Sequence, residues 1–122
     1  MPDATDKTRT KLPAPLIDFK DAYPDVWKAF TRLGDRCHAA GPLDERSRRL
    51  VKVALAIGAG LEGGTHSAVR NALATGVSPD EVRHVVVLAA TTLGLPATVR
   101  GWTWVNDVIE AFEAAEGEGA AE

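Results

Sequence analysis

The chain has 122 residues, 45% of them hydrophobic and 25% charged, and its formal net charge is -3. This length fits one domain with a small hydrophobic core, and the acidic balance argues against a nucleic-acid-binding protein. The single cysteine, Cys37, excludes an intramolecular disulfide and fits a reducing compartment. The polar N-terminus and the short apolar runs predict neither a signal peptide nor a membrane-spanning helix. We therefore expect a cytoplasmic protein without a membrane partner.

The residue pattern predicts an all-α domain between two polar ends. Residues 1–20 carry three prolines among charged residues, and we expect a flexible arm there that docks on a neighbour. Residues 21–115 are expected to form the helical domain, and residues 116–122, "EGEGAAE", an acidic tail. The run "VVVLAATTL" is rich in β-branched residues, but its length and its start signal favour a helix over a strand.

Three helices are expected in the first two thirds of the chain. The first covers Tyr23–Ala39, where apolar residues recur at helical spacing. The second begins after Asp44, a typical N-cap, and its second half is apolar on nearly every side, so we place it centrally. The third begins near Thr65 and ends at Gly76, a residue type that often terminates helices.

Two more helices are expected in the last third. In "SPDE", Ser78 caps a helix and Glu81 completes a capping box, and this helix ends at Gly94. Pro96 opens the last helix, which has two apolar faces. One face holds Trp102, Val105, Ile109 and Phe112, and the other holds Trp104, Val108 and Ala111. Two apolar faces indicate either a subunit contact or an ordinary core helix with one exposed tryptophan.

Several polar residues are interpreted without a chemical role. The cluster of Arg46, Arg48, Arg49 and Lys52 is diluted by acidic neighbours and is typical of a solvated helix face. The pair "CH" at residues 37–38 is interpreted as a helix end, because no second pair of ligands has the spacing of a zinc site. His84 is interpreted as a histidine at the edge of the core or at an interface.

The order of these segments resembles a known family. "LDERSRRLVKVALAIGAG", a short site segment, "AVRNALATGVSPDEVRHVVVLAATTLGLP" and a final helix with tryptophan are similar to the carboxymuconolactone decarboxylase and AhpD-like family over about residues 28–112. The resemblance implies an all-α fold of five to six helices. It also implies a homo-oligomer, a trimer or a hexamer, often with sites between subunits.

The redox members of this family carry Cys-x-x-Cys-x-x-x-His, with a glutamate on the preceding helix. Counting back from Gly76, these positions fall on Leu61, Gly64, Ala68 and Arg49. A thiol peroxidase needs a thiolate nucleophile and a resolving thiol. Because this segment has neither, a peroxidase or antioxidant role is disfavoured. The chain is most similar to a cysteine-free branch of the family.

The site segment "LEGGTHSAVR" keeps a polar set. With one residue of the preceding helix it comprises Glu62, Thr65, His66, Ser67, Arg70 and Arg49. We expect Thr65 to cap the helix and Glu62 to fold back over its first turn. If the segment is helical throughout, then Glu62, His66 and Arg70 lie on one face instead.

This set suggests acid–base chemistry. His66 is the candidate general base, and Glu62 is the candidate residue that orients it. Backbone N–H groups near Thr65 and Ser67, together with Arg70 or Arg49, are candidates for holding a carboxylate. The prediction is a lyase or isomerase without metal or cofactor, acting on a small organic acid or carbonyl compound. The alternative is a non-catalytic oligomeric binding or scaffold protein, in which His66 simply starts a helix.

Overall fold

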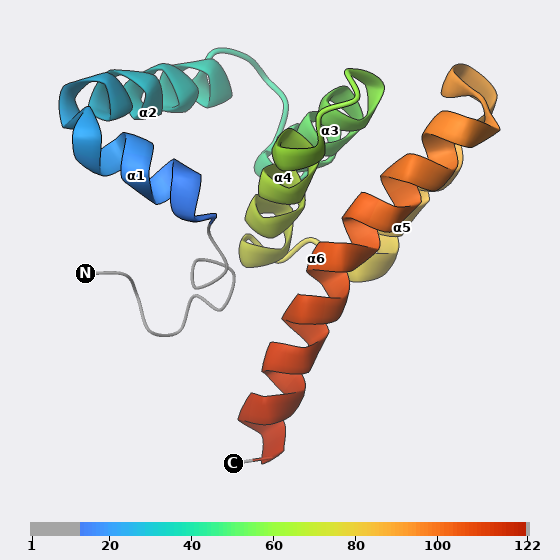
Figure 1. Ribbon diagram of the computed structural model, residues 1–122. Helices are drawn as coiled ribbons and strands as arrows, with labels where there is room; N and C mark the ends of the chain where they lie inside the picture. The colour runs from blue at the N-terminus through green and yellow to red at the C-terminus, as the bar shows by residue number, and fades with distance from the viewer. Residues whose placement is uncertain (1–12, 122) are drawn as a thin grey trace.

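The computed structural model describes the backbone of residues 13–121 and the side chains of residues 13–118. Its elements are α1 (Ala14–Ala22), α2 (Pro24–Ala39), α3 (Glu45–Gly58), α4 (Glu62–Ala74), α5 (Pro79–Leu93) and α6 (Leu95–Ala121). All of them are helices, and the described range contains no strand, which confirms the all-α prediction (Figure 1).

Both ends of the described chain are more helical than the sequence suggested. Residues 14–22, which overlap the expected arm, form α1, a sixth helix that the count of five had missed. The prolines there are compatible with a helix because proline is well suited to a first turn. At the other end, α6 continues to Ala121, through the expected acidic tail. Residues 1–12, the rest of the expected arm, lie outside the described residues.

The predicted helix signals in the middle of the chain are confirmed. Asp44 Oδ1 accepts a hydrogen bond from the Ser47 backbone N–H at 2.8 Å, at the start of α3. At the start of α5, the Glu81 N–H donates to Ser78 Oγ at 3.1 Å, and the Ser78 N–H donates to Glu81 Oε1 at 3.0 Å. Gly76 follows α4 with a φ of +94°, a conformation that glycine adopts at little cost.

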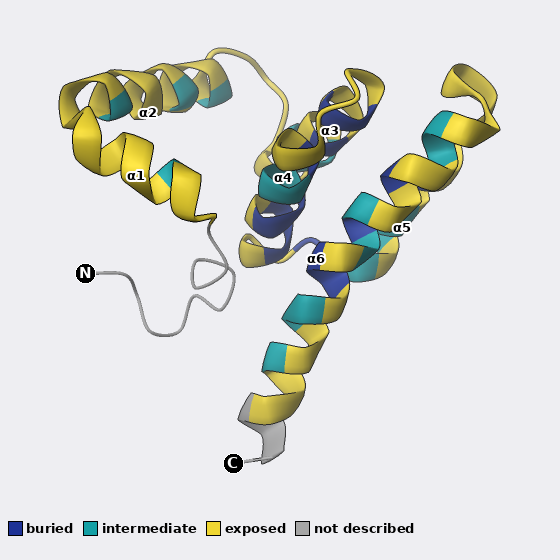
Figure 2. Ribbon diagram, viewed as in Figure 1, coloured by how far each residue is buried: buried dark blue, intermediate teal, exposed yellow. Residues whose placement is uncertain are grey.

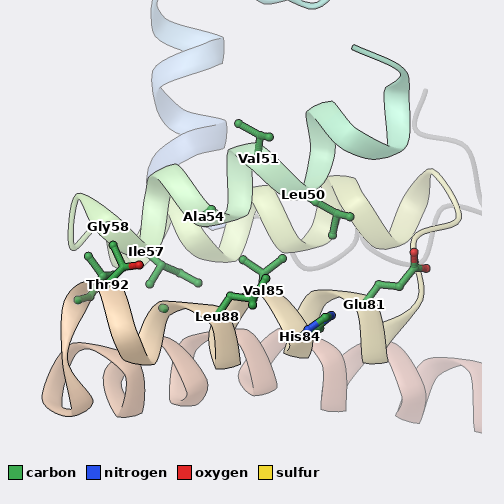
Figure 3. A pocket seen from close by; sticks show the side chains of 12 residues that line it. Leu50, Val51, Ala54, Ile57, Gly58, Glu81, His84, Val85, Leu88 and Thr92 are labelled. Atoms are coloured by element: carbon green, nitrogen blue, oxygen red, sulfur yellow. The ribbon is translucent and has the colours of Figure 1, made fainter.

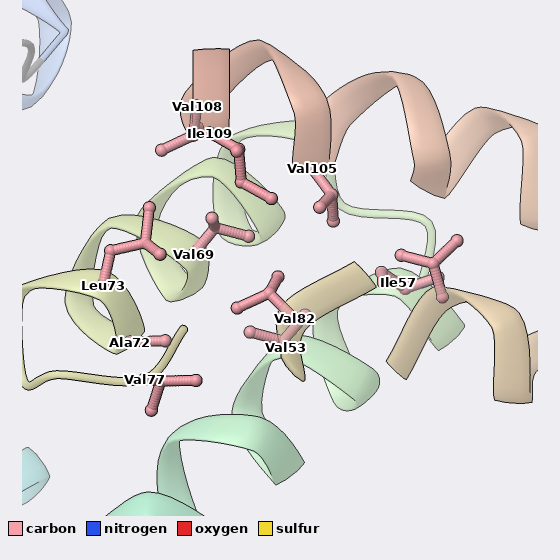
Figure 4. Packing of buried hydrophobic residues seen from close by; sticks show 11 residues of the cluster. Val53, Ile57, Val69, Ala72, Leu73, Val77, Val82, Val105, Val108 and Ile109 are labelled. Atoms are coloured by element: carbon pink, nitrogen blue, oxygen red, sulfur yellow. The ribbon is translucent and has the colours of Figure 1, made fainter. Parts of the chain in front are cut away.

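The hydrophobic core lies among α3, α4, α5 and α6. Figure 4 shows side chains from these helices converging, with Val105 and Ile109 of α6 facing Val69 of α4. The cluster comprises Val53, Ile57, Val69, Ala72, Leu73, Val77, Val82, Val86, Val105, Val108 and Ile109. Part of the first apolar face of α6 is thus core, but Trp102 on that face keeps 44% of its surface exposed.

Helices α1 and α2 contribute no buried residue to this core. Figure 1 shows them packed on each other and set off from the other four helices, and Figure 2 shows them exposed over most of their length. Tyr23, between the two helices, is at least half exposed, and so are Val26, Phe30 and Leu33 of α2. The central helix α3 also shows apolar side chains to solvent, most of all Leu55.

Helix α6 crosses α3 at a glycine. A Cβ atom at Gly101 would lie 3.0 Å from Ile57 Cγ2, whereas a Cβ at Gly117, farther along the same helix, would meet nothing within 4 Å. We expect Gly101→Ala to lower the free energy of unfolding by about 1–2 kcal/mol, because the well-packed Ile57 would have to shift to admit the methyl group. Gly117→Ala is expected to raise it by up to about 1 kcal/mol through helix propensity. Chemical denaturation measures the free energy of unfolding, which is expected to fall in Gly101→Ala and to rise in Gly117→Ala. A rise in both variants would contradict this packing.

Candidate functional site

The site segment forms one continuous helix. Helix α4 begins at Glu62, directly after Leu61, and Gly63 and Gly64 are both helical. The prediction that Thr65 caps this helix is therefore wrong. Thr65 is fully buried one turn inside α4, its N–H donates to Leu61 O at 2.9 Å, and its Oγ1 has no hydrogen-bond partner.

The continuous helix places Glu62, His66 and Arg70 on one face, as the alternative interpretation expected. Their surroundings differ. Glu62 is exposed, whereas the His66 side chain is 23% exposed and its Nε2 lies 3.1 Å from Asp107 Oδ2 on α6. The carboxylate beside His66 thus comes from Asp107. Among the described residues no hydrogen bond or ion pair joins Glu62 to His66.

Arg70 lies deeper than the sequence suggested. Only 8% of its surface is exposed, and burial lowers the pKa of its guanidinium group. No carboxylate within the described range forms an ion pair with it. A long side chain can bury its aliphatic stem in this way against apolar neighbours. We therefore interpret Arg70 mainly as a packing residue of α4.

Arg49 and Ser67 lie elsewhere, on a groove between α2, α3 and α4, which we call the acid groove. Its volume is about 1150 Å³. Its polar lining comprises Asp35 and His38 from α2, Glu45, Arg48, Arg49 and Lys52 from α3, and Ser67 and Asn71 from α4. Its apolar lining includes Phe30, Leu55, Ala56, Leu61 and Ala68. The groove thus combines a cationic wall with an apolar one.

The acid groove also gathers the four positions that the resemblance assigns to redox residues. Leu61, Gly64, Ala68 and Arg49 all line it. Two helices and the turn between them bring these positions together, although they span twenty residues of sequence. The groove lining contains no cysteine, and Cys37 is exposed on α2.

The arginines of the acid groove have partners for only some of their N–H donors. Arg49 Nη2 lies 3.6 Å from Glu45 Oε1, and Arg48 Nη1 donates to the carbonyl oxygen of Leu43. The Nε atoms of both arginines are buried and have no hydrogen-bond partner. Buried donors without partners are costly, so these two Nε atoms make this wall of the groove less stable than a fully hydrogen-bonded one.

His38 also lines the acid groove, a role that its interpretation as a helix end had missed. Its pKa is lowered, first by burial and then by the charges of Arg49, Lys52 and Arg48, while Glu45 acts weakly in the opposite direction. The sequence placed His38 only at the end of α2. It gave no sign that the cationic side chains of α3 line the same groove.

A second groove lies between α3 and α5 and has a volume of about 520 Å³. Figure 3 shows Leu50, Val51, Val85 and Leu88 around it, with His84 and Glu81 towards one end. His84 is exposed beside this apolar surface. Its interpretation as an interface histidine stays a prediction.

Glu81, beside this second groove, is expected to make stability depend on acidity. Hydrogen bonds from Arg46 and from Ser78 lower the Glu81 pKa from 4.5 to about 2. A depressed carboxyl pKa contributes stability above the unfolded value, and this contribution is lost as the pH falls from about 4.5 to about 2. We expect Arg46→Gln to reduce the fall of Tm across this pH range. Arg36→Gln, which removes the same charge from α2, should keep the wild-type slope; equal slopes for all three proteins would contradict the assignment.

Comparisons with known proteins give one match. Residues 24–107 match the family described as the Carboxymuconolactone decarboxylase family. No curated protein and no solved structure gives a significant match. Among the described residues, no helix is long and apolar enough to cross a membrane, and no group of three or more metal-ligating side chains occurs.

Proposed function

We propose that this chain, which belongs to the carboxymuconolactone decarboxylase family, binds a small organic acid in the acid groove. In this proposal it acts on that acid as a lyase or isomerase without a cofactor. The observation that carries the proposal is that Arg49, Ser67 and the family's motif positions line one groove, together with the cationic residues Arg48 and Lys52.

The groove lining suggests the shape of the ligand. Arginine binds carboxylates through paired N–H donors, and both Arg48 and Arg49 line the groove. Lys52 adds a third positive charge, and Phe30 and Leu61 offer apolar surface. A compound with one carboxylate and a compact apolar body therefore suits this groove best.

The peroxidase alternative finds no support in this groove. The motif positions hold leucine, glycine and alanine, and the lone thiol of Cys37 is not part of the lining. A thiol peroxidase would need a second thiol to resolve the oxidised first one. The chemistry open to the lining residues is acid–base chemistry.

His66 offers a second candidate site on the opposite side of α4. Its contact with Asp107 resembles a base oriented by a carboxylate. In this version Asp107 takes the role that sequence analysis gave to Glu62. His66 lines neither of the two grooves described above, so it ranks below the acid groove.

Binding of phenylpyruvate tests the function. This 2-oxo acid carries a carboxylate and a compact apolar ring, and its affinity is measured by calorimetry. We expect Arg49→Gln to raise Kd by about tenfold or more, the loss typical of a hydrogen bond to a charged group. Arg100→Gln, which removes the same charge from α6, should leave Kd unchanged.

The outcomes separate the alternatives. If neither phenylpyruvate nor benzoate binds, or if Arg49→Gln leaves Kd unchanged, the acid groove is not the ligand site. Binding that depends on Arg49 but brings no turnover would favour the non-catalytic binding protein over the enzyme.

The proposal includes self-association. Isolated helices of the length of α1 and α2 are marginal in water, yet neither has a buried residue, and their apolar stripe of Tyr23, Val26, Phe30 and Leu33 faces solvent. The groove between α3 and α5 is a second apolar surface. A homo-oligomer, a trimer or a hexamer by family resemblance, would cover such surfaces.

A further inference from the structure

His38 differs from the other titratable groups of the acid groove in one respect. It is the only histidine among the lining residues, where it stands on α2 across from the cationic wall of α3. An imidazole is better suited than the carboxylates and cations of this lining to transfer a proton near neutral pH, because its ordinary pKa lies closest to 7.

We propose that His38 is the proton-transfer residue of the acid groove, acting on the carbon next to the carbonyl of a bound 2-oxo acid whose carboxylate Arg49 and Lys52 hold. This inference rests on the proposed function and deepens it, because it names the substrate class and the base. It assigns the base to a residue that neither the family resemblance nor the sequence pattern had selected.

The charges around His38 suit this role. On its own helix Asp35 lines the same groove; α3 contributes Glu45, Arg48, Arg49 and Lys52, and α4 contributes the neutral Ser67 and Asn71. Burial and the three cations lower the His38 pKa below its usual 6.5, which favours the neutral imidazole that can accept a proton. A bound carboxylate offsets the cations and stabilises the imidazolium that then forms.

The step balances without an oxidant or a cofactor. A C–H bond next to the ketone breaks, its proton forms an N–H bond on the neutral imidazole, and its electron pair moves into the enolate. The imidazolium then returns a proton to carbon, so that His38 is regenerated. In heavy water the same cycle exchanges the carbon-bound hydrogen of the ligand for deuterium.

His66 is less suited to this step. It is not among the residues that line the acid groove, and its contact with Asp107 places it beside α6 instead. A base there would act on a ligand that Arg49 and Lys52 do not hold.

Deuterium exchange at the methylene carbon of phenylpyruvate tests the proposal. The rate is followed by proton NMR in heavy water with the full-length protein, and the rate without protein is subtracted. We expect His38→Gln to lower kcat for exchange by about 10²-fold or more, the usual contribution of a general base, with KM unchanged. His84→Gln, a matched change at the rim of the other groove, should keep the wild-type rate.

A second readout follows the imidazole itself. His38→Gln identifies the His38 ring signals, and their titration is recorded with and without phenylpyruvate. We expect phenylpyruvate to move the titration midpoint of His38 upward, and the neutral benzyl methyl ketone to leave it in place.

Each outcome bears on a different part of the proposal. Wild-type exchange rates in His38→Gln, or a rate lost in His66→Gln instead, would overturn the role of His38 while leaving the acid groove as the binding site. Binding that depends on Arg49, without exchange above the rate in buffer, would also overturn it. Failure of phenylpyruvate and benzoate to bind would overturn the proposed function, and this role with it.

Discussion

The double variant Val26→Glu and Leu33→Glu is expected to convert the proposed homo-oligomer into monomers of about 12.9 kDa. Both residues lie on the apolar stripe of α2 and are 53% and 59% exposed in the single chain. Burying a side chain of this size contributes about 1.5–3 kcal/mol. Losing the burial of two such side chains at each contact would therefore weaken association by about 10²-fold or more. Sedimentation equilibrium at several protein concentrations measures this directly.

The matched control is Lys28→Glu with Arg32→Glu. It places two acidic residues on the same helix, but on the face opposite the stripe. We expect this control to keep the wild-type mass. A wild-type chain that sediments as a monomer at every concentration, with unchanged helix content, would show that α1 and α2 need no partner.

The parts of the fold that the sequence revealed are those set by near neighbours. The caps at Asp44 and Ser78 and the glycine stop at Gly76 each involve residues within a few positions of one another. The start of α4 was misread because two consecutive glycines usually disfavour a helix. There, packing outweighs propensity: a Cβ at Gly64 would lie 3.0 Å from Leu61 Cβ, so the close turn tolerates only a small residue.

The candidate site was predictable only in part, and for the same reason. Arg49 and Ser67 were selected from the sequence, and both line the acid groove. The neighbours that give the histidines their surroundings come from distant segments. His66 meets Asp107 across 41 positions of sequence, and His38 faces α3 across a turn. Periodicity predicts which side of each helix is apolar, but it does not predict which other helix packs against that side.

The substitution Ile109→Ala is expected to have the largest effect on stability. Ile109 is fully buried where α6 packs into the core of α3, α4 and α5. Removing a buried isoleucine side chain costs about 2–5 kcal/mol, because the surrounding helices close only partly around the cavity. A domain of this size has about 5–15 kcal/mol in total. The variant should therefore unfold at a much lower urea concentration.

Val99→Ala is the control on the same helix, since Val99 is 55% exposed. We expect it to change the free energy of unfolding by no more than about 0.5 kcal/mol. Both variants are compared with the wild type at one protein concentration, because self-association would add to the measured stability. Neither residue lines the acid groove, so the folded fraction of each variant should bind phenylpyruvate with the wild-type Kd. Equal stability losses in the two variants would mean that α6 is not anchored through Ile109.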